Sequence, residues 1–164
     1  MTAQVRRFNT IRAGMGLPPD QPTTLLWTYC AETASKAEEG WEYFHNQLLA
    51  AQHHYFEWNN PGYAGIPGYE EYLKRQTADV GVADASLAAR RATQPIGTPD
   101  EIIEKIRTLQ HALSLEMVVI HMFYGGMPRG KAEKSLRLFA EKVLPAVQAM
   151  PTSINPASLA HPLT

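Results

Sequence analysis

One group of residues that could do chemistry lies where an apolar segment ends. In "EMVVIHMFYGG", His121 alternates with apolar side chains, so one face of an extended segment would carry a single ionisable group. Such a histidine is either a hydrogen-bonded core residue or an acid or base. Tyr124, Gly125 and Gly126 close the segment, where two glycines either let a ligand approach the backbone or make a plain turn into a helix. This end is therefore a candidate for ligand contact.

A second candidate lies in "IGTPDEIIEKI", where Gly97 and Thr98 precede a helical pattern. The Thr98 side chain can accept from the amide of Glu101, and the Glu101 carboxylate can accept from the Thr98 amide, which together form a capping box. Amides at a helix start can also hold an anion such as a phosphate. Because the capping box uses the same amides, a helix start at Pro99 competes with an anion site.

A third candidate is the pair Arg90 and Arg91, which ends the polar run "QTADVGVADASLAARRATQP". An arginine at the end of a loop could close over a phosphate. Solvated surface arginines are the alternative interpretation.

Other site classes find little support in the sequence. His45, His53 and His54 are spaced by eight and nine residues, which does not bring two ligands to one ion, so we reject a metal site. Cys30 is the only cysteine and lies in an apolar run, which predicts a small core residue and not a nucleophile.

Charge and hydropathy exclude two kinds of partner. The formal net charge is −1 and the basic pairs are scattered, so the sequence does not predict nucleic-acid binding. No segment reaches the roughly 18 apolar residues of a membrane span, and the first residues lack the apolar core of a signal peptide. We therefore expect a cytoplasmic protein without a membrane partner.

The elements that must position these residues alternate between helix and strand. Apolar spacing predicts a helix that ends near Gly14, a strand in "TTLLWTYCAET", a helix over 34–55 and, after Thr98, a helix with an Ile/Leu stripe. Residues 70–74 favour a short helical piece, and 76–94 a long mobile loop. We also expect a short strand before Thr98, a fully covered strand in "EMVVIHMFYGG", and a helix over 131–149 that kinks at Pro145. Residues 151–164 are expected to form a flexible tail.

This alternation favours an α/β fold with about three parallel strands. Three parallel strands make a poor independent sheet, because each needs cover on both faces and neighbours on both edges. The helix stripes "WEYFHNQLL", "IIEKIRTLQHAL" and "LRLFAEKVL" likewise need cover.

Three stretches of the chain resemble one known family. "IGTPDEIIEKI", "GGMP" and "SLRLFAEKVLPAV" resemble the C-terminal portion of the bacterial luciferase-like, flavin-dependent monooxygenases. The closing pattern of that family is matched by Ser135, Leu138, Phe139, Val143 and Pro145. The resemblance runs from about residue 5 to 150 and is most specific over 96–145.

The resemblance implies a fold and a chemistry. This chain would be the C-terminal part of a (β/α)8 TIM-type barrel over residues 1–150, with the loop at 76–94 as a lid that excludes water and opens for substrate. It would belong to a monooxygenase in which reduced FMN, supplied by a partner flavin reductase, reacts with molecular oxygen to oxidise a small organic substrate. A related deazaflavin is an open alternative to FMN.

The same resemblance implies an incomplete site. A barrel needs eight strands and about 250 residues, and the family's earlier strands provide most flavin contacts and the main catalytic histidine. The isolated chain is therefore expected to be inactive. It is either a fragment of a longer enzyme, a truncated reading frame, or a piece that forms a homo-oligomer or pairs with a complementary chain. The alternative is a non-catalytic half-barrel that serves as an assembly or interaction module.

Overall fold

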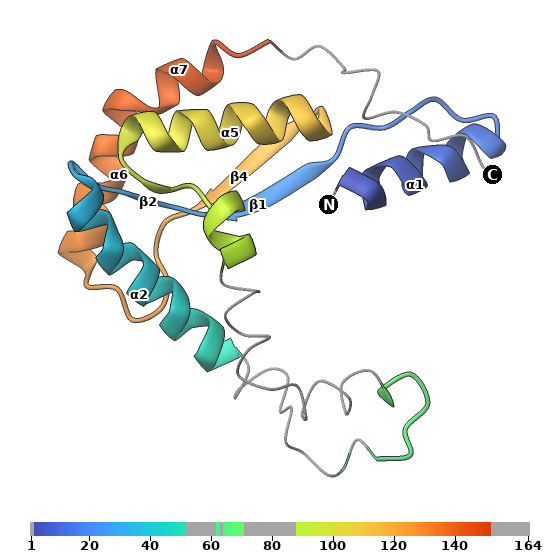
Figure 1. The fold of residues 1–164 in the computed structure, drawn as a ribbon, viewed down its shortest axis with the longest axis horizontal. Coiled ribbons are helices and arrows are strands. Elements are labelled where there is room, and N and C mark those ends of the chain that lie inside the picture. The colour runs from blue at the N-terminus through green and yellow to red at the C-terminus, as the bar shows by residue number, and fades with distance from the viewer. Residues whose placement is uncertain (1, 52–61, 63, 71–87, 152–164) are drawn as a thin grey trace.

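The computed structural model describes residues 2–51, 62, 64–70 and 88–151, and is a helix-rich α/β structure with short parallel strands (Figure 1). The predicted alternation of helix and strand is confirmed. In chain order the elements are α1 (Thr2–Gly14), β1 (Thr23–Trp27), β2 (Tyr29–Cys30), α2 (Ala34–Ala51), β3 (Ile96–Gly97), α5 (Pro99–Leu113), β4 (Met117–His121), α6 (Arg129–Lys142) and α7 (Leu144–Gln148).

Several predicted segments lie outside the described residues. These are the last turn of the helix expected over 34–55, nearly all of the helical piece at 70–74, residues 76–87 of the expected lid, and the tail beyond Pro151. Residues 88–93 are helical, so the prediction of an irregular segment through residue 94 is wrong at this end. Alanine and arginine are strong helix formers, and Arg91 is held against α2 by Glu38.

Two parallel strand pairs share one extended segment. β1 pairs with β4, with Thr23 opposite Met117 and Trp27 opposite His121, and β2 pairs with β3. Between β1 and β2, the buried Thr28 donates its amide to the carbonyl of His121. In a TIM-type barrel each strand lies beside the next strand along the chain, so β3 would lie between β1 and β4. Here β4 pairs directly with β1.

The β1–β4 pair is covered on one face only. Leu26 is 1% exposed and packs in a core with α5, which lies along the two strands (Figure 1). On the opposite face Leu25, Met117 and Val119 are 48%, 54% and 41% exposed. The expectation of a fully covered strand at β4 is therefore wrong, because alternate side chains point to opposite faces and only one face has a helix against it.

The core consists of two clusters. One lies between the strands and α5, α6 and α7, and includes Cys30, which is buried and free as predicted. The other surrounds Trp41 and Phe44 of α2. The predicted stripes are confirmed at their centres, whereas Leu49, Leu136 and Leu144 were expected inward and are 41%, 52% and 39% exposed. These three lie at the margins of their stripes, where the helix turns toward solvent.

Local sequence signals explain the helix ends. α5 begins with the predicted capping box at Thr98 and ends at Ser114, whose positive φ of 51° satisfies the left-handed cap. The helix expected over 131–149 breaks at Val143, two residues before Pro145, and resumes as α7. The proline removes an amide donor and so ends the α6 hydrogen-bond ladder.

Candidate functional site at the carboxyl ends of the strands

An aromatic cluster forms where β1 and β4 end. The ring centroids of Trp27 and His121 are 4.4 Å apart, because these residues are partners in the strand register. Tyr124 packs edge-on against Trp27 at 5.1 Å and lies 6.0 Å from His121. Phe44 of α2 reaches Trp27 at 6.3 Å. The parallel pairing thus brings two sequence-predicted residues, His121 and Tyr124, to a common place with Trp27.

His121 is the last residue of β4 and is half-buried. Its Nε2 lies 3.0 Å from the carbonyl oxygen of Phe123, so the tautomer with hydrogen on Nε2 donates to that carbonyl. The strand was expected to run to Gly126 but ends at His121, because the chain turns at Tyr124 to Met127, where the Met127 amide donates to the Tyr124 carbonyl. His121 therefore has a local hydrogen bond and an aromatic neighbour.

Tyr124 is 5% exposed, and its hydroxyl has no hydrogen-bond partner within the described part of the chain. Burial raises the pKa of this phenol, so the group is a neutral donor at any physiological pH. A buried hydroxyl without an acceptor is uncommon, and the free energy of its desolvation is uncompensated.

The two glycines after Tyr124 have different surroundings. Both have positive φ, 61° at Gly125 and 74° at Gly126. A Cβ on Gly125 would lie 1.8 Å from the carbonyl oxygen of Tyr43, whereas a Cβ on Gly126 would meet nothing within 4 Å. The Gly125 amide donates to the Gln47 side chain. Gly125 thus allows α2 to approach the turn, and only Gly126 has open space beside it.

The predicted arginines lie on the helical segment 88–93. Arg91 forms a bidentate pair with Glu38 at 2.9 and 3.2 Å, and its guanidinium lies 4.8 Å from the Trp41 ring centroid. The Glu38 carboxylate raises the pKa of Arg91, so the charge is held in this pair. Arg90 lies 6.0 Å from the Phe44 ring, over the aromatic side of α2.

Gly97 and Thr98 form hydrogen bonds within the strand pair and the helix start. The Gly97 carbonyl accepts the amide of Ala31, and the Thr98 amide donates to the Glu101 carboxylate at 2.8 Å. A Cβ on Gly97 would lie 2.6 Å from the same carboxylate oxygen. The capping box thus occupies the Thr98 amide, and the same carboxylate lies against Gly97.

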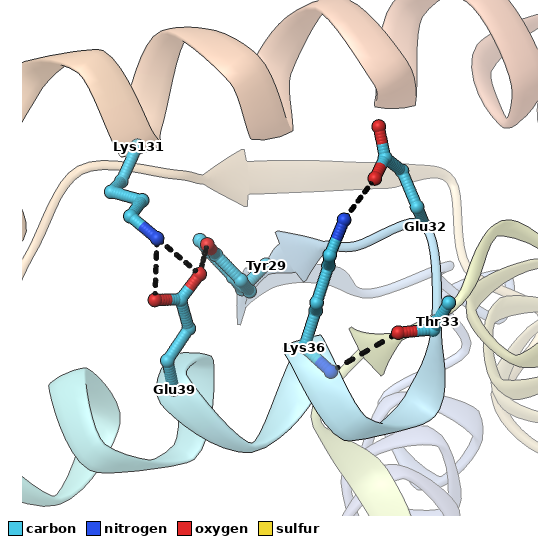
Figure 2. A network of polar contacts seen from close by, with 6 residues as sticks. All are labelled: Tyr29, Glu32, Thr33, Lys36, Glu39 and Lys131. Atoms are coloured by element: carbon cyan, nitrogen blue, oxygen red, sulfur yellow. Dashed lines mark hydrogen bonds and ion pairs between the residues drawn. The ribbon is translucent and has the colours of Figure 1, made fainter.

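A polar cavity that the sequence did not predict opens at the end of β2, between α2 and α6. Its volume is about 280 Å³. Figure 2 shows that Glu39 accepts hydrogen bonds from Tyr29 and from Lys131, while Lys36 pairs with Glu32. The lining residues are Tyr29, Cys30, Ala31, Glu32, Ser35, Lys36, Glu39, Lys131, Lys134, Ser135 and Leu138.

Hydrogen bonds fix the charge states of this cavity. Lys131 and then Tyr29 lower the pKa of the Glu39 carboxyl, and Glu39 in turn raises the pKa of Lys131. Burial and the bond to Glu39 raise the pKa of Tyr29, so its phenol stays protonated. Burial raises the pKa of the Cys30 thiol to about 12, which leaves it unreactive at neutral pH.

A sequence signal exists for each wall of the cavity. Lys131, Lys134, Ser135 and Leu138 recur at steps of three and four, which places them on one face of α6. Glu32 just before α2, and Lys36 and Glu39 within its first two turns, follow the same spacing. Nothing in the sequence indicates that the two faces meet, because that depends on how β2 places both helices.

The described residues contain neither a metal-ligand cluster nor a membrane-spanning helix. Among them, no three His, Cys, Asp or Glu side chains lie together as metal ligands would, while His53 and His54 fall outside this part of the chain. Of the described helices, none combines the length and apolar character needed to cross a membrane.

Comparison with known proteins gives a likeness of fold. The chain is similar to the solved structure of the monooxygenase RslO1 from Streptomyces bottropensis, with a TM-score of 0.52 and 21% identity. The similarity covers 88% of this chain and 38% of that one. No family model and no curated protein matches the chain. The chain therefore shares an α/β arrangement with part of a longer monooxygenase.

Proposed function

We propose that this chain is part of a flavin-dependent monooxygenase that uses reduced FMN and molecular oxygen to oxidise a small organic substrate. One observation carries the proposal: a fold similar to part of a monooxygenase places Trp27, His121 and Tyr124 together at the carboxyl ends of parallel strands. Ligands of open α/β sheets and of barrels bind at this end. The flavin assignment comes from the motifs over 96–145, which resemble those of the luciferase-like family.

The described residues do not fit the phosphate of FMN at the positions predicted for it. Arg91 is paired with Glu38, and the Thr98 amide is taken by Glu101. We therefore assign the phosphate contacts of FMN to residues other than Arg91 and Thr98. This chain would contribute an apolar wall, in which Trp27 and Tyr124 exclude water from one side of the site.

A direct test compares the isolated chain with a longer one. The 164-residue chain is titrated with oxidised FMN by flavin fluorescence, and oxygen uptake is followed with reduced FMN from a flavin reductase. The same two assays are applied to a longer chain that contains this sequence. We expect binding and uptake only in the longer chain. Flavin-dependent uptake by the isolated chain would contradict an incomplete site, and no flavin binding by either chain would contradict the monooxygenase proposal.

A pair of variants in the longer chain tests the wall. Trp27→Leu removes the ring that contacts His121 and Tyr124, and we expect a loss of oxidised product relative to oxygen consumed. Leu136→Ala, at an exposed position of α6, is the matched control and should leave that ratio unchanged. An equal ratio of product to oxygen consumed in the two variants would show that Trp27 does not form part of the site.

A second candidate function is a non-catalytic half-barrel that assembles with another chain. The exposed apolar face of β1 and β4, formed by Leu25, Met117 and Val119, favours it. Both candidates need cover over this face, from the rest of a longer chain, a second copy or a complementary chain, and they differ in whether the complete protein consumes oxygen with reduced flavin.

A further inference from the structure

We propose that the cavity between α2 and α6 is a binding site for a small anion, either a carboxylate or a phosphate monoester. The cavity volume of about 280 Å³ lies just below the range of drug-sized pockets, so the ligand is small. This site is separate from the aromatic cluster and does not depend on the flavin proposal.

The charge of the cavity favours an anion. Its lining includes three lysines and two glutamates, which leaves one net positive charge. Both carboxylates are already engaged, Glu32 by Lys36 and Glu39 by Lys131 and Tyr29 (Figure 2). Lys134 forms no hydrogen bond or ion pair within the described residues and acts on Glu32 only through space. The cation in excess is therefore Lys134.

The hydrogen-bond inventory points the same way. Ser135 is 1% exposed, and its Oγ accepts the amide of Cys30 at 2.8 Å, which leaves its own O–H for another acceptor. Ser35, at the start of α2, adds a second hydroxyl. Lys134 contributes only donors. A ligand that binds here must consequently bring acceptor oxygens, as carboxylates and phosphates do.

The floor of the cavity limits what else the ligand carries. Cys30 and Ala31 are buried, and Leu138 is half-buried on α6. These side chains offer apolar contact next to the lysines. The ligand is thus an acid whose short apolar body lies on this floor, with its charged end toward Lys134.

The test measures anion binding in the intact chain by amide chemical shifts in solution. Sodium phosphate and sodium acetate are titrated separately, with ionic strength held constant by sodium chloride. We expect saturable shifts of the Ala31, Lys36 and Ser135 amides with an affinity in the millimolar range. Shifts that do not saturate, or that spread over all exposed lysines, would overturn the proposal.

Three variants sharpen the test. Lys134→Gln should weaken binding about fivefold. Lys142→Gln removes the same charge from the end of α6, outside the cavity, and should leave binding unchanged. Glu32→Gln frees Lys36 and should strengthen binding about twofold, which general damage could not do. Equal effects of Lys134→Gln and Lys142→Gln would contradict a site at this cavity.

A last arm identifies the source of a phosphate. FMN and riboflavin, which differ by the phosphate group, are titrated in the same way. Cavity shifts with FMN that riboflavin does not cause, and that Lys134→Gln abolishes, would assign the site to the phosphate of the flavin. Cavity shifts with acetate and inorganic phosphate but not FMN would assign it to a separate small acid.

Discussion

At the scale of single residues, two neighbouring glycines differ in what they permit. Gly125→Ala would place a Cβ 1.8 Å from the Tyr43 carbonyl oxygen at a φ of 61°. We expect it to lower the free energy of unfolding by about 2–4 kcal/mol, from left-handed strain and steric overlap together. Gly126→Ala has the strain without the overlap and should cost about 1 kcal/mol. Urea denaturation of both variants checks this, and equal losses would show that α2 does not contact the turn.

Two tyrosines at the strand ends should respond in opposite ways to loss of the hydroxyl. Tyr124→Phe removes a buried hydroxyl without a partner among the described residues and should leave stability unchanged or raise it by about 1 kcal/mol. Tyr29→Phe removes a hydrogen bond to the Glu39 carboxylate and should cost about 1–2 kcal/mol. A clear loss of stability in Tyr124→Phe, measured by urea denaturation, would reveal an acceptor for that hydroxyl.

The Glu39 carboxyl predicts a dependence of stability on pH. Its pKa is lower in the folded chain than its ordinary value of 4.5, chiefly because Lys131 donates to it. The contribution of this carboxylate to the free energy of unfolding is therefore complete above pH 4.5. It is lost as the pH falls below that value through the pKa of the folded chain. Urea denaturation between pH 6 and 3 should show that the free energy of unfolding falls less steeply with decreasing pH in Lys131→Met than in the unchanged chain. An identical slope would mean that the pair does not form.

At the scale of elements, the starts of α2 and α5 allow a matched comparison. Thr98→Ala removes the N-cap of a capping box with Glu101, and we expect a loss of about 1–2 kcal/mol. Thr33 accepts the Lys36 amide at 3.3 Å, but the residue at the third helical position is a lysine, so no carboxylate returns the bond. Thr33→Ala should cost about 0.5–1 kcal/mol. Free energies of unfolding measured under the same conditions test this difference. A larger decrease in Thr33→Ala than in Thr98→Ala would contradict the capping-box account.

At the scale of the whole molecule, the exposed face of β1 and β4 predicts association. Removal of this face from water would contribute about 25 cal/mol for each Å² of apolar surface. We expect sedimentation at micromolar concentration to show a dimer or larger assembly, and Val119→Lys to shift it toward monomer. Leu136→Lys, at an exposed apolar position on α6, is the control and should not. A compact monomer of the unchanged chain that unfolds cooperatively would instead indicate a self-contained α/β domain.

The sequence by itself determined the elements of this protein. The capping box at Thr98, the Ile/Leu stripe of α5 and the break before Pro145 are local signals, because hydrogen bonds between residues three or four apart decide them. The helix over 88–93 was not predicted by local signals, because a contact with Glu38 of α2 stabilises it. The burial of Cys30 also followed from its apolar neighbours.

Only the tertiary structure decided which residues meet. The register of β1 with β4 placed Trp27 beside His121, although 94 positions separate them in the printed numbering. The packing of both α2 and α6 against β2 brought Glu39 to Lys131 and so created the cavity. The uncovered face at Val119 has the same origin, because an apolar strand pattern does not specify how many layers will pack against it. Helix periodicity is a property of neighbours in the chain, whereas sites at strand ends depend on neighbours in space.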